Sequence, residues 1–336
     1  MKTKTDPLSL LENRMLLSLL RTSLWGEAVD PGLAELGSGG WYAVYNQACR
    51  QAVQGVTFDA VGSLPESLGP GLSLGARWML DADLIARRYG RIKDVTARLG
   101  EVWKSLEINA VHLKGTEIAE MYPVPEHRIC GDVDWYFARP DHRAAAGGWA
   151  ARKGLNPRVD SDGTLHYMLN GVVVEHHRLP FDPSDPKETL VMLNLHILKH
   201  SMVCGIGLRQ LCDLAVAYRH MAGSYDAAAL KADLRSKRLL RWTGMLHCVL
   251  TDYIGLPEEY LPWPERSERM HADARLFVGI VFVDGNFGQS KKRRYSGMPN
   301  RIALLSRYAP LRMIKRFFSL AFGRIAKKRR HFASKI

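Results

Sequence analysis

The sequence predicts an α+β protein in which a small mixed α/β unit lies between two helical parts. Leucines recur at helical spacing near the N-terminus, short β-rich runs with a hairpin signal fill the middle, and helical spacing returns from about residue 187 to residue 278. A chain of 336 residues suits about two domains, or one domain with a long appendage. We expect a helical region over 1–107, the α/β core over 108–180, a second helical region over 181–284 and a basic amphipathic tail over 285–336.

The N-terminal part contains three segments with the periodicity of amphipathic helices. Residues 8–25 repeat leucine and methionine at helical spacing, and residues 41–53 and 73–107 show the same pattern. The segment 73–107 is long and carries Arg and Lys on one face. These three segments predict a helical N-terminal region.

The middle of the chain changes to short β-rich runs. Residues 110–113 (AVHL) and the run ICGDVDWYF predict strands, and residues 117–122 predict a short helix that ends before Pro123. RPDHRAAAGGWAARKG predicts a helix with a Gly-rich interruption. Residues 165–179 predict a β-hairpin, because Asn170-Gly171 is a strong signal for a two-residue turn between strands.

Composition limits the class of protein. Hydrophobic residues make up 46% of the chain, which is ordinary for a globular protein. The five cysteines show no paired spacing, so they predict neither a zinc knuckle nor a disulfide framework. We find no apolar run of about 18 residues and no signal peptide, and we therefore expect the cytoplasm as the compartment.

Two aspartates one residue apart interrupt an apolar strand. Asp132 and Asp134 must point to the same face, where their charges repel unless a cation lies between them. Glu175 ends the second strand of the predicted hairpin and brings a third carboxylate if that strand lies beside the first. Hard carboxylate oxygens suit Mg²⁺ or Mn²⁺, so the three residues are the candidate metal ligands and catalytic groups. A chance Asp-x-Asp that caps a turn is the alternative.

A Gly-containing turn precedes these aspartates. In HLKGTE, Gly115 permits close approach of the backbone to a phosphate, Thr116 supplies a hydroxyl, and the following helix offers its N-terminal amides to an anion. Lys114 can add positive charge, although a solvated lysine is the more common case. We therefore treat these three residues as candidate nucleotide-binding residues.

The order of these motifs resembles a known family. LKG, then MYPVPEHRICGDVDWYF, VVVEHHRL and LNLHILKH with LRQLCDLA, across about residues 110–216, are similar to the nucleotidyltransferase-like family of bacterial proteins within the polymerase-β-type superfamily. DGNFGQ (284–289) is similar to a block near the end of some members. The wider superfamily has Gly-Ser in the turn where this chain has Gly115-Thr116.

The resemblance implies a minimal nucleotidyltransferase-type mixed sheet and the metal-dependent transfer of a nucleoside monophosphate from a triphosphate such as ATP to an acceptor. The metal carboxylates would be Asp132, Asp134 and Glu175, and the phosphate turn would contain Gly115 and Thr116. Two alternatives stay open: a catalytically silent protein that kept the fold and binds nucleotides, and a glycosyltransferase that holds Mn²⁺ with Asp-x-Asp.

Five further polar residues are weighed as substrate contacts. Arg128 can bind a triphosphate oxygen or pair with a site carboxylate, and a surface salt bridge is the alternative. His177 shares the Glu175 face and can assist proton transfer or orient a ligand, and a structural hydrogen bond is the alternative. His196 and His200 have metal-like i, i+4 spacing, but substrate or core contacts are favoured over zinc. Asp213 is a candidate substrate contact that can instead pair with Arg209 on its own helix.

The positive charge of the chain is concentrated at its C-terminal end. From Gly285 to Ile336 there are fifteen Lys and Arg and no Asp or Glu, whereas the rest of the chain is nearly neutral. Bulky apolar residues, among them Phe317, Phe318 and Phe322, lie among these cations. This composition favours peripheral contact with an anionic membrane, with binding to another polyanion or packing of a helix on the body as alternatives.

Overall fold

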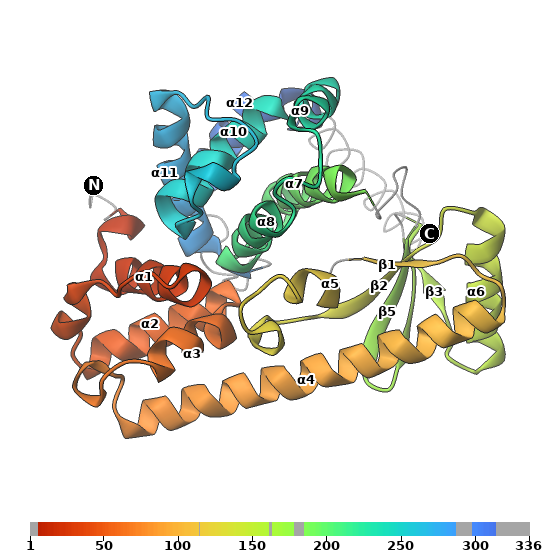
Figure 1. The fold of residues 1–336 in the computed structure, drawn as a ribbon, viewed down its shortest axis with the longest axis horizontal. Helices are drawn as coiled ribbons and strands as arrows, with labels where there is room; N and C mark the ends of the chain where they lie inside the picture. Colours follow the sequence, from red (N-terminus) through yellow and green to blue (C-terminus); the bar gives the residue numbers. More distant parts are fainter. Residues whose placement is uncertain (1–5, 114, 161–162, 178–184, 287–297, 314–336) are drawn as a thin grey trace, which may run out of the picture.

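A computed structural model describes residues 6–113, 115–160, 163–177, 185–286 and 298–313, and every structural statement below refers to these residues. The N-terminal helices and the sheet are connected by one long helix, α4 (Leu72–Ser105), whose 34 residues extend for about 50 Å. Figure 1 shows α4 passing beneath the N-terminal helices at one end and the sheet at the other. Before it come α1 (Leu11–Trp25), α2 (Ser38–Gln51) and α3 (Gln54–Gly62).

The described residues form one five-stranded mixed sheet with the order β1-β2-β5-β4-β3. Strand β2 pairs parallel with β5 and antiparallel with β1, and β4 pairs antiparallel with both β5 and β3. The strands are β1 (Val111–Leu113), β2 (Asp132–Tyr136), β3 (Arg158–Val159), β4 (Leu165–Leu169) and β5 (Val172–His177). Two further helices, α5 (Thr116–Ala119) and α6 (Pro140–Arg152), lie between the first three strands in the chain.

The hairpin turn fixes the register of the sheet. Asn170 and Gly171 both have positive φ, at 50° and 74°, as a two-residue turn between twisted strands requires. Leu169 therefore pairs with Val172, and the same register continues to Leu165 opposite His176. The predicted hairpin is confirmed, and it decides which side chains of β5 face the interior of the sheet unit.

The C-terminal helices stand over the N-terminal helices and over one face of the sheet (Figure 1). They are α7 (Pro186–Val203), α8 (Leu208–His220), α9 (Ala227–Ser236), α10 (Leu240–Val249), α11 (Glu268–Asp284) and α12 (Met298–Tyr308). Short 3-10 helices are η1 (Pro7–Ser9), η2 (Pro31–Glu35), η3 (Glu66–Leu68), η4 (Pro125–His127) and η6 (Glu258–Tyr260), and the π-helical turn η5 (Leu250–Ile254) continues α10.

Two apolar cores hold the described chain together. The larger core joins α1–α3 and the first half of α4 to the C-terminal helices. The smaller core lies between the sheet and the second half of α4, with Trp103 fully buried against it, and includes one face of α6. The first and third of the four segments expected along the chain therefore share one core.

Part of the predicted basic tail belongs to the larger core. Leu304, Leu305 and Tyr308 of α12 are buried within it, and Arg301 forms a buried ion pair with Asp284 at 2.9 Å. The packed-helix alternative therefore holds for α12. Residues 287–297 and 314–336, including the three phenylalanines, lie outside the described residues.

Most predicted elements are present, with three differences. The helix expected at RPDHRAAAGGWAARKG is not interrupted, since α6 runs through its glycines. Gly147 instead allows close packing on the sheet, because a Cβ at this position would come within 2.9 Å of Leu165 Cδ1. Helix α3 and strand β3 were not predicted. Among the described residues, no helix is long and apolar enough to cross a membrane.

Candidate active site

The alternation of strand β2 separates its charged side chains from its apolar ones. Val133 and Trp135 belong to the smaller core on the α4 side, whereas Asp132 and Asp134 lie on the opposite face and line a cavity. This cavity has a volume of about 300 Å³. The prediction that both aspartates share one face is confirmed.

Strand β5 brings the third carboxylate to the same face. Glu175 pairs directly with Asp134 in the parallel register, and His177 pairs with Tyr136 two residues further along. His177 Nε2 lies 2.6 Å from Asp134 Oδ1 and 3.2 Å from Glu175 Oε2. The predicted positions of Glu175 and His177 are confirmed, while their roles stay predictions.

Among the described residues, these three side chains form a group that could hold a metal ion. Ligand atoms of Asp134, Glu175 and His177 all lie within 4.8 Å of one another. Asp132 lines the same cavity but is not part of this close group, so the trio differs from the one expected from the sequence. Two carboxylates suit Mg²⁺ or Mn²⁺, and an added imidazole is also tolerated by Mn²⁺ and other transition metals. The donor set therefore fits a divalent cation.

The opposite wall of the cavity comes from helices α7 and α8. It contains His196, Lys199, His200, Arg209 and Asp213. The rings of His196 and His200 lie 4.2 Å apart on successive turns of α7, and His200 Nδ1 lies 3.4 Å from Cys204 Sγ. Neither histidine belongs to a group of three side chains in the described chain that could hold a metal ion.

The Gly-containing turn reaches the cavity through Gly115. Gly115 lines the cavity and has a φ of 50°, in the region that favours glycine. Thr116 is buried and is not among the residues that line the cavity, and the helix that follows has only four residues. The structure therefore does not place the Thr116 hydroxyl or a helix N-terminus toward a ligand. Lys114 lies outside the described residues.

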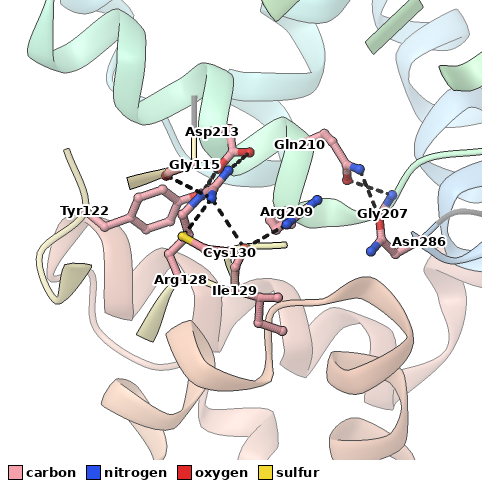
Figure 2. A network of polar contacts seen from close by, with 10 residues as sticks. All are labelled: Gly115, Tyr122, Arg128, Ile129, Cys130, Gly207, Arg209, Gln210, Asp213 and Asn286. Carbon is pink, nitrogen blue, oxygen red and sulfur yellow. Dashed lines mark hydrogen bonds and ion pairs between the residues drawn. The ribbon is translucent and has the colours of Figure 1, made fainter. Parts of the chain in front are cut away.

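A buried ion pair connects this turn to the helical wall (Figure 2). Arg128 donates from Nε and Nη2 to the two carboxylate oxygens of Asp213 at 2.9 and 2.7 Å, and from Nη1 to Gly115 O at 3.1 Å. The Tyr122 hydroxyl donates to Asp213 Oδ1 at 2.7 Å. Burial alone would raise the pKa of Asp213, but the charge and hydrogen bonds of Arg128, together with the charge of Arg209 and the hydrogen bond of Tyr122, outweigh burial and hold that pKa below its ordinary value.

This pair corrects two expectations. The partner of Asp213 is Arg128 and not Arg209, because α8 turns Asp213 toward the sheet unit. The ion pair of Arg128 is buried and does not lie on the surface, and its donors serve Asp213 and neighbouring backbone carbonyls. Arg128, which lines the cavity, thus holds the Gly115 turn in place through its bond to Gly115 O.

Sequence reasoning gave Arg209 no role in the site. Arg209 lines the cavity and donates from Nη1 to Ile129 O at 2.7 Å. Its neighbour Gln210 closes the start of α8 by accepting from Gly207 N at 3.0 Å and donating to Asn286 Oδ1 at 2.9 Å (Figure 2). Asn286 lies in the DGNFGQ block, so that block holds the first turn of α8 against the site.

Comparison with known proteins gives one match. No curated protein and no solved structure matches the chain. Residues 37–188 match the sequence model of a family described as "Uncharacterised nucleotidyltransferase". The matched part includes Asp132, Asp134 and Glu175, whereas most of α7 and all of α8 lie beyond it. The resemblance to nucleotidyltransferase-like proteins is therefore confirmed for residues 37–188, the part of the chain that contains the sheet and its three carboxylates.

Proposed function

We propose that the protein is a metal-dependent nucleotidyltransferase that moves a nucleoside monophosphate from a nucleoside triphosphate to an acceptor. The observation that carries this proposal is the close group of Asp134, Glu175 and His177 in a cavity of about 300 Å³, within the family-matched part of the chain. Cavities of that size suit a small-molecule substrate.

In the proposed reaction an acceptor oxygen attacks the α-phosphorus of the triphosphate. The new bond between oxygen and α-phosphorus forms as the bond to the bridging oxygen of the β-phosphate breaks, and pyrophosphate leaves with that electron pair. Glu175 is partly exposed toward the cavity and takes the proton of an acceptor hydroxyl. The chemistry supplied by Mg²⁺ or Mn²⁺, when bound, is neutralisation of phosphate charge and alignment of the displaced groups.

The chain's own residues supply the ligands and their orientation. Asp134 and Glu175, with Asp132 beside them, hold the cation. His177 contacts both Asp134 and Glu175 and so fixes the direction of the two carboxylates. Gly115 offers backbone at the cavity for the triphosphate, and His196, His200 and Asp213 line the wall where further substrate contacts are available.

The test is pyrophosphate release. The purified protein is incubated with each of the four triphosphates, Mg²⁺ or Mn²⁺, and a cell extract as the source of acceptor. We expect release with at least one triphosphate, and we expect Asp134→Asn to abolish it, whereas Asp141→Asn, an exposed carboxylate on α6, leaves it unchanged. Binding of metal and triphosphate without release would support the silent binding protein, and transfer from a sugar nucleotide would support the glycosyltransferase.

We further propose that residues 314–336 contact an anionic membrane peripherally. This segment contains eight Lys and Arg, no Asp or Glu, and several phenylalanines. Each cation near an anionic surface contributes about 1 kcal/mol. The measurement is co-sedimentation with anionic vesicles at low and high salt. The full chain should sediment with the vesicles, whereas a chain that ends at Met313, and therefore still contains α12, should stay in the supernatant. Equal sedimentation of the two would exclude this contact, and binding to nucleic acid alone would identify another polyanion.

A further inference from the structure

Two neighbouring arginines in the wall of the cavity differ in how their charges are balanced. Arg128 makes two hydrogen bonds to the carboxylate of Asp213, so its buried charge is matched by one of opposite sign. Arg209 forms no ion pair with any carboxylate of the described residues, and its Nη1 donates a hydrogen bond to the carbonyl of Ile129. Figure 2 shows the two guanidinium groups on either side of the Ile129–Cys130 backbone.

The surroundings of Arg209 penalise its charge. Its Nε is buried and has no hydrogen-bond partner in the described chain. Burial, followed by the nearby charge of Arg128, lowers the pKa of Arg209 below its ordinary value. A partly buried cation without an ion-pair partner costs free energy. Ionisable groups in a cleft that are perturbed by burial and by a nearby charge are concentrated at functional sites.

The position of Arg209 indicates the sign of that ligand. It lines the same cavity as Gly115 and the carboxylates of β2 and β5. The first amides of α8 are already satisfied, since Gly207 N donates to Gln210 Oε1 and Leu208 N donates to Gln51 Oε1. The guanidinium of Arg209, and not either of these two amides, is therefore the group that can receive an anion here.

We propose that Arg209 binds the phosphates that are not transferred, those of the leaving pyrophosphate. This inference rests on the proposed function, because it places a triphosphate in this cavity. The guanidinium offers a fork of N–H donors that matches phosphate oxygens. In the ground state Arg209 holds the β- and γ-phosphates. As the bond to the α-phosphorus breaks, it stabilises the negative charge that the leaving group gains.

The experiment measures affinity for inorganic tripolyphosphate with Mg²⁺ by titration calorimetry. Arg209→Gln should weaken binding about 10- to 100-fold, as expected for loss of a charge-assisted bidentate contact. Arg209→Lys should recover part of the affinity. The matched control is Arg219→Gln on the same helix, where the guanidinium stacks on Trp25 away from the cavity, and it should bind like the wild type.

A stability measurement separates binding from a structural role. Because Arg209 is not matched by a carboxylate, Arg209→Gln should leave the urea midpoint unchanged or raise it. Wild-type affinity in Arg209→Gln, no tripolyphosphate binding by the wild type, or a lowered midpoint together with lost affinity would each overturn the proposal. A separate result, pyrophosphate release that is unaffected by Asp134→Asn, would refute the proposed function while leaving the anion site of Arg209 intact.

Discussion

The two faces of the five-stranded sheet contain the same strands but opposite chemistry. On the α4 face, Val133, Trp135 and Val174 pack beneath Trp103, and even His176 is held neutral there, because burial lowers its pKa to about 3. On the cavity face, the residues next to them in the chain are Asp132, Asp134, Glu175 and His177. Because side chains alternate along a strand, residues on one face stabilise the fold and residues on the other face can bind a ligand. Substitutions at adjacent positions should therefore change either the free energy of unfolding or the activity.

The largest effect should come from the cavity face. Glu175→Gln keeps the shape of the side chain but removes a metal ligand and the proposed base, so pyrophosphate release should fall about 10²- to 10⁴-fold. The free energy of unfolding should change little, since Glu175 is partly exposed. Glu101→Gln, an exposed glutamate on α4, is the matched control. Release within two-fold of the wild type would remove Glu175 from the mechanism.

The next effect concerns the buried ion pair between Arg128 and Asp213 in the wall of the cavity. Asp213→Asn leaves the charge of Arg128 buried without its partner, which should cost about 3–5 kcal/mol of unfolding free energy. Asp83→Asn breaks an exposed pair with Arg87 and should cost less than about 1 kcal/mol. Urea denaturation measures both. A similar cost for the two variants would show that Arg128 is compensated in another way.

A smaller effect should appear on the α4 face of strand β5. Val174→Ala removes two buried methyl groups from a fully buried site, which should cost about 2 kcal/mol. Val173→Ala, one residue earlier on the partly exposed cavity face, should cost less. Pyrophosphate release per folded molecule should stay close to the wild type in Val174→Ala. A larger loss of activity than of stability there would contradict the division between the two faces.

The features that were predicted correctly from the sequence depend on short-range patterns. Period-two alternation placed Asp132 and Asp134 on one face, and the Asn170-Gly171 turn fixed the register that brings Glu175 beside them. Helical periodicity found most helices for the same reason. Such patterns concern residues a few positions apart, so they are visible without the fold.

Long-range partners could not be predicted in this way. Asp213 had a plausible partner in Arg209 four residues away, but the tertiary fold supplied Arg128, 85 positions distant. Because Asp213 pairs with Arg128, Arg209 has no ion-pair partner among the described residues, and no pattern in the sequence indicates this. The packing of α12 was likewise hidden, because its cations suggested a tail whereas its buried leucines join a core made by distant helices.

A last contrast extends the comparison from the sheet to the helical interior, where a histidine is buried without carboxylates. His247 on α10 is fully buried, its Nε2 lies 3.1 Å from the Tyr218 hydroxyl, and its ring packs against Trp263. Burial, with a smaller effect from Arg266, lowers its pKa from the ordinary 6.5 to about 3. The unfolded chain therefore binds a proton at His247 below about pH 6.5 that the folded chain does not bind. Stability should be fully present above pH 6.5 and should decrease as the pH falls toward 3, by at most about 1.4 kcal/mol per pH unit from this residue.

The variant His247→Gln tests this contrast. It keeps a polar atom near Tyr218 and removes the titration, so its unfolding free energy should decrease less steeply between pH 6.5 and pH 4 than that of the wild type. His220→Gln, which changes an exposed histidine on α8, should keep the wild-type dependence of unfolding free energy on pH. Equal slopes for His247→Gln and the wild type would show that His247 accepts a proton in the folded state.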